Sequence, residues 1–203
     1  MIVGISAGQG QGKSTLINAL CELDGFERLE LQTSREILKE WGYTLDEVNR
    51  YLPLKQRFQE ECLRRHTKAL NQGHGSPFDS DNETPYETIL LVERTFSDIY
   101  AYTVLGMGAF NEYSEWLHNY GLQCAQAQNA YFNEVVFMTG RTYTPEDDGV
   151  RSINQDFSDV ANHLIKKYTL QFSEASVIDT AGLDERVANM RNIADRLRAE
   201  EAA

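Results

Sequence analysis

Eight residues near the beginning of the chain combine glycine, lysine and hydroxyl side chains at a spacing that can hold phosphate. The run from Ala7 to Ser14 reads AGQGQGKS. Glycines let backbone N–H groups approach phosphate oxygens, and a helix that begins after them points its positive end at the same oxygens. We expect Lys13 to reach the β- and γ-phosphates of a nucleotide and the Ser14 hydroxyl to bind Mg²⁺. The expected nucleotide-binding residues are Gly8, Gln9, Gly10, Gln11, Gly12, Lys13, Ser14 and Thr15.

An apolar run precedes this loop, and a helical pattern follows it. Ile2, Val3 and Ile5 are β-branched and predict a buried strand, whereas residues 16–20 have helical spacing. The loop therefore joins a strand to the amino end of a helix, which is the context in which such a sequence binds phosphate. Ala7 stands where the commoner form of the motif has glycine.

Strands and helices are expected to alternate along the rest of the chain. Further apolar runs predict strands at residues 26–33, 88–92, 134–140 and 175–182. Helices are expected between them, the longest over residues 45–70, and again after residue 184. This pattern predicts one domain, residues 1–203, with an α/β fold: a P-loop NTPase three-layer sandwich with a mostly parallel five-stranded sheet and a short lid at about residues 141–163. Phosphates would bind at the carboxyl end of the first strand.

Composition and charge limit the classes of partner. The chain has 203 residues and a net charge of −12, which argues against a general nucleic-acid-binding surface. Residues 55–68 are locally basic and form either a solvated helix face or a nucleic-acid contact. No apolar run is long enough to cross a membrane. Cys21, Cys62 and Cys124 fit no disulfide or zinc pattern, which predicts a cytoplasmic location.

A charged pair ends the strand expected at residues 88–92. Glu93 is placed to hold Mg²⁺ through water, and Arg94 to contact the acceptor or the transferred phosphoryl group. A motor or oligomeric ATPase would have an Asp-Glu pair here, with the glutamate polarising water. Nothing in this sequence is clearly placed to activate water, which favours transfer over hydrolysis. The alternative is that the pair forms a surface ion pair.

A second motif, VIDTAG, ends the strand near the carboxyl end of the chain. Asp-x-x-Gly after a strand is a GTPase signature, but there it follows an early strand, whereas Asp179 follows the last one. An Asn-Lys-x-Asp guanine-binding motif is also missing before it. We therefore interpret residues 179–182 as the loop beside the nucleotide base, with Ala181 as a binding residue.

The segment VERTFSDIYAYTVLGMG resembles the Glu-Arg-Ser segment of deoxyribonucleoside kinases, and thymidylate kinases carry a related Asp-Arg-aromatic motif. SREIL resembles a segment of small phosphate-loop kinases that include the ribosylnicotinamide kinases. EDDGVRS resembles their lid, which has an Asp-Gly-x-Arg turn. The small size is similar to that of phage nucleotide kinases. In order and spacing the resemblance covers most of the chain.

The resemblance implies a role for several residues. Glu93 would assist Mg²⁺ and Arg94 would contact the acceptor oxygen or the transferred phosphate. Arg141 and Arg151 would close over the phosphates as lid arginines, where charge develops on the transferred group. If they do not, they are ordinary loop charges. The expected substrate-binding residues are Arg35, Glu36, Arg94 and Asp98.

One position departs from this resemblance. Nucleoside kinases of this type carry a glutamate after the second strand as the base for the attacking hydroxyl, and Gln32 stands there in this chain. Either the base comes from elsewhere, with Glu36, Asp79 and Asp81 as candidates, or none is needed. Phosphoryl transfer depends mainly on positioning and charge, and a phosphate acceptor needs no base, which slightly favours a monophosphate.

The sequence therefore predicts an ATP-dependent, Mg²⁺-dependent kinase whose acceptor is a nucleotide or nucleoside, with the deoxyribose type favoured. One alternative keeps the chemistry but has a phage enzyme phosphorylate 5-hydroxymethyluracil within DNA. Another is an ATPase or nucleotide switch without a small acceptor. Residues 113–132, which include Trp116, form either a homodimer face or part of the core.

Overall fold

A parallel sheet of five strands forms the centre of the protein, of which the computed structural model describes residues 1–73, 88–140 and 155–203. The strands lie in the order β2-β3-β1-β4-β5, and each neighbouring pair is parallel. Val3 lies between Leu91 and Glu134 in the register. The predicted α/β fold with its five-stranded sheet is confirmed. The strands are β1 (Ile2–Ser6), β2 (Phe26–Leu29), β3 (Ile89–Glu93), β4 (Glu134–Met138) and β5 (Ala175–Ile178).

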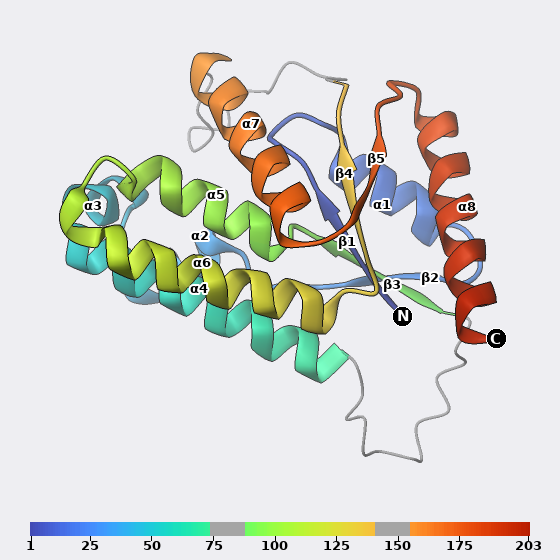
Figure 1. The fold of residues 1–203 in the computed structure, drawn as a ribbon, viewed down its shortest axis with the longest axis horizontal. Helices are drawn as coiled ribbons and strands as arrows, with labels where there is room; N and C mark the ends of the chain where they lie inside the picture. Colours follow the sequence, from blue (N-terminus) through green and yellow to red (C-terminus); the bar gives the residue numbers. More distant parts are fainter. Residues whose placement is uncertain (74–87, 141–154) are drawn as a thin grey trace.

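Helices cover both faces of this sheet (Figure 1). The helices are α1 (Lys13–Cys21), α2 (Ser34–Trp41), α3 (Leu45–Arg50), α4 (Leu52–Gly73), α5 (Phe96–Met107), α6 (Ser114–Tyr131), α7 (Gln155–Phe172) and α8 (Leu183–Glu201). On one face, α1 and α8 pack on the sheet through Leu16, Leu20, Met190 and Leu197. On the other face, α4, α5, α6 and α7 form the cover, with Phe96 fully buried. The arrangement is the expected three-layer sandwich.

The long helix expected over residues 45–70 is divided into α3 and α4, and this prediction was wrong. Tyr51 separates the two helices with φ −122° and ψ 99°, an extended conformation. Pro53 follows in the first turn of α4, where the missing backbone N–H costs no helical hydrogen bond. Inside a continuous helix the same proline would remove a hydrogen bond and its ring would clash with the carbonyl four residues earlier, so one helix could not run unbroken across this point.

Strand β1 holds the centre of the sheet and is buried along its whole length. Gly4 allows the beginning of α5 to approach it, because a Cβ at this position would lie 2.7 Å from Thr95 Cγ2. Ser6, the last residue of β1, donates a hydrogen bond to Asp98 Oδ1 at 2.9 Å and lies 3.0 Å from Thr169 Oγ1. These contacts join β1 to α5 and α7 just before the glycine-rich loop begins.

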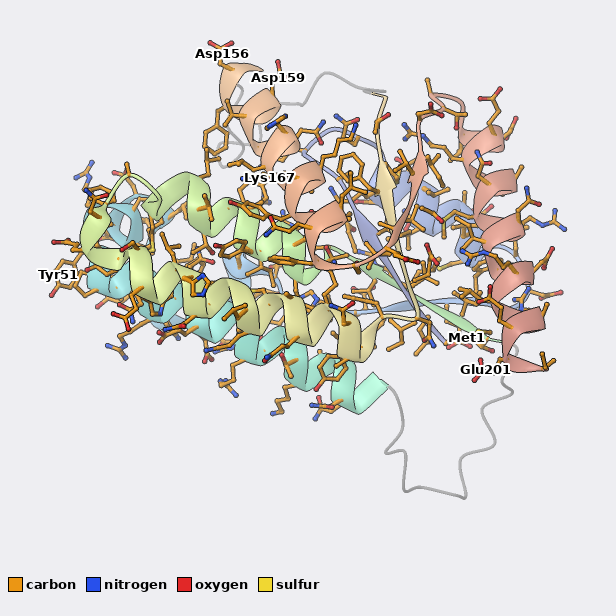
Figure 2. The ribbon with its side chains drawn as sticks, viewed as in Figure 1. Met1, Tyr51, Asp156, Asp159, Lys167 and Glu201 are labelled. Atoms are coloured by element: carbon orange, nitrogen blue, oxygen red, sulfur yellow. The ribbon has the colours of Figure 1, made fainter. Side chains whose placement is uncertain are left out.

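The two chain ends lie near each other at the amino end of β1. Met1 and Glu201, both labelled in Figure 2, line one shallow pocket with Asn133 and Leu197. The Met1 ammonium donates a hydrogen bond to Thr88 O at 3.3 Å, immediately before β3. Among the described residues, the helices are all too short or too polar to span a membrane.

Candidate nucleotide-binding and phosphoryl-transfer site

The glycine-rich loop joins β1 to α1 at the carboxyl edge of the sheet. Gly10 and Gly12 adopt left-handed conformations, with φ of 72° and 77°, and Gly12 is the residue that immediately precedes α1. These φ values favour glycine, because a Cβ would clash with the backbone. Lys13 Nζ donates hydrogen bonds to Ala7 O at 2.8 Å and Gly8 O at 2.9 Å. The lysine thus lies across the loop, with the amino end of α1 facing the same space.

A side chain from α7 supports the first part of this loop. Asn162 Oδ1 accepts a hydrogen bond from the Gly8 backbone N–H at 3.1 Å. A Cβ at Gly8 would lie 3.0 to 3.2 Å from side-chain atoms of Asn162, so the contact is close. The sequence analysis did not identify Asn162, because nothing in its local pattern distinguishes it from other polar residues of α7.

The residues expected to bind Mg²⁺ meet at the beginning of α1. Ser14 Oγ donates a hydrogen bond shared by both oxygens of Glu93, at 2.9 and 3.1 Å. Arg28 Nη2 of β2 lies 3.1 Å from Glu93 Oε2, a contact that the sequence analysis missed. A hydroxyl and a carboxylate are hard oxygen donors of the kind that Mg²⁺ takes, with phosphate oxygens and water completing its shell. The residues present therefore fit Mg²⁺. Within the described ranges no cluster of three or more His, Cys, Asp or Glu suits a metal, so such an ion would depend on nucleotide oxygens.

Arg94 follows Glu93 in a conformation that is rare outside glycine. Its φ is 81°, and its backbone N–H donates to Ile5 O at 3.1 Å, which fixes the turn against β1. Such backbone strain is concentrated at functional sites. The exposed guanidinium lies over the Tyr102 ring, 5.7 Å from its centroid. The structure thus places Arg94 at the same sheet edge as Lys13 and Glu93.

Burial holds two titratable groups near Arg94, His66 and Cys62, neutral. His66 of α4 is buried with its ring 4.7 Å from the Phe96 ring, and its Nε2 has no hydrogen-bond partner within the described ranges. Burial, with a smaller effect from the Arg94 charge, lowers the pKa of His66 to about 3. Burial likewise raises the pKa of Cys62 to about 12. Arg94 is therefore the charged group that this part of the site presents.

Asp98 lies inside the fold. It is 1 % exposed, and its carboxylate accepts hydrogen bonds from Ser6 Oγ and from the Thr95 backbone N–H, the latter at 2.8 Å. Burial raises the pKa of Asp98, and the nearby Lys13 charge opposes that rise. The contacts are those of a residue that caps α5 and joins it to β1. That Asp98 contacts the acceptor stays a prediction.

The residues expected to contact the acceptor from α2 are exposed. Glu36 caps this helix: its carboxylate accepts the Thr33 backbone N–H at 2.6 Å, and this hydrogen bond is the main cause that lowers its pKa. Glu36 is thus less suited to accept a proton than a free carboxylate. Arg35 lies beside it and is exposed.

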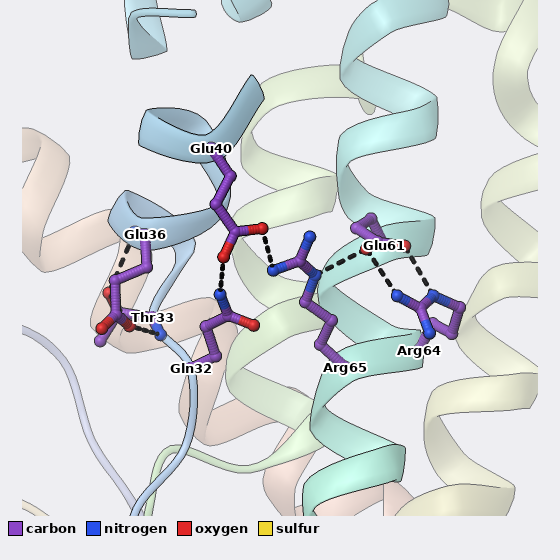
Figure 3. Close-up of polar contacts among 7 residues, drawn as sticks. All are labelled: Gln32, Thr33, Glu36, Glu40, Glu61, Arg64 and Arg65. Carbon is purple, nitrogen blue, oxygen red and sulfur yellow. Dashed lines mark hydrogen bonds and ion pairs between the residues drawn. The ribbon is translucent and has the colours of Figure 1, made fainter. Parts of the chain in front are cut away.

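Gln32, which stands where the resemblance to nucleoside kinases implies a base, is held by a charged network (Figure 3). Its Nε2 donates to Glu40, and Glu40 also pairs with Arg65 of α4 at 2.6 Å. Arg65 in turn contacts Glu61 at 2.6 Å. The amide of Gln32 is therefore oriented by a partner on α2 and, through it, by α4.

The remaining predicted site residues follow β4 and β5. Ala181 lies in the loop between β5 and α8, and a Cβ on Gly140 would be 3.4 Å from the carbonyl oxygens of Asp179 and Thr180. The loops after the two strands are thus in close contact. Arg141 and Arg151, together with Asp79 and Asp81, lie outside the described residues, and so does most of the expected lid; its last residues form the beginning of α7.

The five-stranded parallel sheet, with the glycine-rich loop between β1 and α1, is the α/β fold of a P-loop NTPase. Three solved structures are similar to it. Deoxyadenosine kinase from M. mycoides with bound dATP has a TM-score of 0.63 and 14% identity, and the match covers 96% of this chain and 100% of that one. Thymidylate kinase from Candida albicans has a TM-score of 0.54 and 13% identity, with 97% and 92% covered, and NadR protein in complex with NR has a TM-score of 0.58 and 12% identity, with 89% and 44% covered. The chain spans less than half the length of the NadR chain. No protein-family model and no curated protein sequence matches. The expected resemblance to these kinase groups is confirmed at the level of fold.

Proposed function

We propose that the protein is a kinase that transfers the γ-phosphoryl group of ATP to a nucleoside or nucleotide with the help of Mg²⁺. The observation that carries this proposal is the meeting of Lys13, Ser14, Glu93 and Arg94 at one sheet edge. The Ser14–Glu93 hydrogen bond of 2.9 Å connects the phosphate loop directly to the end of β3. The solved structures that share this fold, which include deoxyadenosine kinase and thymidylate kinase, support the same class of reaction.

The loop residues would bind and orient the triphosphate. Lys13 Nζ, which contacts the Ala7 and Gly8 carbonyls, would turn to the β- and γ-phosphates. A bound Mg²⁺ would neutralise developing charge on the phosphate oxygens, and the Ser14 hydroxyl would hold it directly and Glu93 through water. Arg94 would place its guanidinium where negative charge spreads over the transferred group.

Transfer to an acceptor is favoured over hydrolysis by the state of the nearby carboxylates. Glu93 is engaged by Ser14 and Arg28, and Glu36 by Thr33. Neither is free to take a proton from water. Transfer through a loose transition state depends on positioning and charge more than on a strong base, and a bound acceptor is already positioned. An ATPase or switch would instead release inorganic phosphate at a rate that no acceptor increases.

The proposal for DNA as acceptor loses support in α4. Its basic run was the feature in favour of a nucleic-acid contact, but Lys55 is buried and lies near Gly106 O at 3.3 Å. Arg64 and Arg65 both pair with Glu61. These three side chains are thus engaged within the protein. We therefore place small nucleosides and nucleotides first.

A panel of acceptors tests the proposal. Transfer from γ-labelled ATP with Mg²⁺ would be measured for nucleosides, their monophosphates and DNA with or without 5-hydroxymethyluracil. Lys13→Ala should lose at least about 100-fold in rate, since it removes a charge aligned with the transferred group. Lys68→Ala, an exposed lysine of α4, is the matched control and should retain the parent rate. Transfer that Lys13→Ala leaves intact would contradict the assignment.

A further inference from the structure

Arg186 is a buried, positively charged residue in the first turn of α8, where both burial and the helix dipole are unfavourable for its charge. It is the fourth residue of α8 and is 2 % exposed. The amino end of a helix carries partial positive charge, which suits the acidic Asp184 and Glu185 before it and not an arginine. Burial also removes water from the guanidinium, so the charge must be met by protein groups. A residue placed here against these costs needs an explanation beyond the formation of α8.

The guanidinium of Arg186 binds carbonyl oxygens from three loops. Nη1 donates to Gln11 O at 2.6 Å, in the glycine-rich loop after β1. Nη2 donates to Thr139 O at 2.9 Å and Gly140 O at 2.7 Å, after β4. Nε donates to Thr180 O at 2.7 Å, in the loop after β5. The rigid, planar fork of arginine can reach all of these at once, which the single ammonium of lysine cannot.

The contact with Gln11 fixes the direction of one N–H in the phosphate loop. The Gln11 carbonyl and the Gly12 N–H belong to the same peptide unit, and no cis peptide occurs among the described residues. In a planar trans peptide the two groups point in opposite directions. Because the carbonyl points to Arg186, the Gly12 N–H points to the side away from the guanidinium. Gly12, with φ 77°, would otherwise have more backbone freedom than other residues.

Two of these loops, those after β1 and β5, retain hydrogen-bonding capacity. Gln11 Oε1 and Thr180 Oγ1 are buried and have no partner within the described ranges. Both belong to residues whose carbonyls bind Arg186. Buried polar atoms in folded proteins are nearly always paired, so their presence here indicates that a polar ligand completes this part of the molecule.

We propose that Arg186 is a positioning residue for the donor nucleotide. It orients the Gln11–Gly12 peptide for phosphate and holds the loops after β4 and β5 beside the phosphate loop. The inference rests on the proposed function only in that the ligand is a nucleoside triphosphate. It requires binding and does not require transfer to any acceptor.

Titration with a fluorescent ATP analogue tests the inference in the full chain. Arg186→Met keeps most of the length and loses the fork and the charge, and it should raise the Kd by about tenfold. Arg186→Lys keeps the charge without the fork and should also weaken binding. Arg198→Met is the matched control: Arg198 lies on α8 too and donates to Gly25 O at 3.2 Å, in the loop before β2 at the amino edge of the sheet. It should leave the Kd unchanged.

Thermal unfolding, the KM for the acceptor and a rescue experiment separate this role from a purely structural one. In the Arg186 variants we expect the KM for ATP to rise while the KM for the acceptor stays constant. We also expect added methylguanidine to restore ATP binding to Arg186→Ala. A lower unfolding midpoint in the Arg186 variants with an unchanged Kd for ATP would overturn it. Equal weakening by Arg198→Met would also overturn it. A parent that bound no ATP would refute the proposed function as well, whereas one that bound ATP but transferred nothing would refute only the kinase.

Discussion

Glu93 is the residue that joins the expected Mg²⁺ ligand Ser14 to β2 through Arg28. Its carboxylate accepts from Ser14 and pairs with Arg28, so both oxygens are already oriented toward the beginning of α1. The adjoining Arg94 turn is fixed by the hydrogen bond from its backbone N–H to Ile5 O in β1. A substitution of Glu93 should therefore change the Mg²⁺ dependence separately from nucleotide binding.

Replacing Glu93 by glutamine keeps its size and removes its charge. We expect Glu93→Gln to raise the Mg²⁺ concentration needed for half-maximal rate by about tenfold, because Mg²⁺ prefers a carboxylate to a neutral amide. Glu30→Gln is the control: Glu30 also pairs with Arg28, at 3.2 Å, whereas the Ser14 hydroxyl bonds to Glu93. A Mg²⁺ titration of the transfer rate measures both. An unchanged Mg²⁺ requirement in Glu93→Gln would remove Glu93 from the metal site.

The sequence predicts those site residues whose function follows from neighbours in the chain. Gly12, Lys13 and Ser14 belong to one short motif, and Glu93 ends an apolar strand. Arg28 and Arg186 could not be predicted in this way, because their contacts depend on strand register and on the packing of distant loops. A signal for Arg186 did exist, since it is spaced with Met190, Ala194 and Leu197 along the buried face of α8.

At the scale of elements, a charged network holds α2 against α4 (Figure 3). Glu61 is its centre on α4 and contacts Arg64 at 2.7 Å and Arg65 at 2.6 Å. Through Arg65 and Glu40 the network reaches α2 and Gln32. It sets the position of the helix that carries Arg35. The sequence did not reveal these pairs, because the positions of α2 and α4 relative to each other follow from the tertiary fold.

Stability should depend on pH through Glu61. Hydrogen bonds from Arg64, and then from Arg65, lower its pKa from 4.5 to about 2 in the folded protein. A lowered carboxyl pKa stabilises the fold above the unfolded value and loses that effect as the pH falls. Glu61→Gln should thus cost about 1 kcal/mol at pH 7 for this partly exposed group. The difference from the parent should vanish as the pH falls from 4.5 toward 2.

Denaturant unfolding of parent and variant at several pH values measures this effect. Glu201→Gln, an exposed carboxylate at the end of α8, is the control and should follow the parent at each pH. A difference between Glu61→Gln and the parent that stayed constant down to pH 2 would show that the ion pairs do not carry the effect.

At the scale of the whole molecule, the sheet brings residues from distant parts of the chain to one edge. The alternation of strands and helices was sufficient to predict a parallel sheet covered on both faces. The strand order was not predicted, because every order with the same alternation satisfies the same apolar pattern. The break between α3 and α4 was missed for a related reason: helical spacing continues across Tyr51, and only the following Pro53 indicates it.

The central position of β1 makes Gly4 a test of how tightly the layers pack. A Cβ there would lie 2.7 Å from Thr95 Cγ2 and 3.0 Å from the Phe132 ring. Gly4→Ala should therefore lower the free energy of unfolding by about 1 to 3 kcal/mol, as overpacking of a core does. Gly182→Ala is the control, since its Cβ would have no neighbour closer than 3.6 Å. Equal stability of Gly4→Ala and the parent would show that α5 can shift from β1 without cost.

Following the γ-phosphate of labelled ATP tests the central claim most directly. The measurement records, for the parent with Mg²⁺, the share of label on an acceptor and the share released as inorganic phosphate. The account predicts that one nucleoside or nucleotide receives most of the label, and that release without acceptor is slow. Free phosphate formed at the same rate whichever acceptor is present would contradict the account and identify a hydrolase.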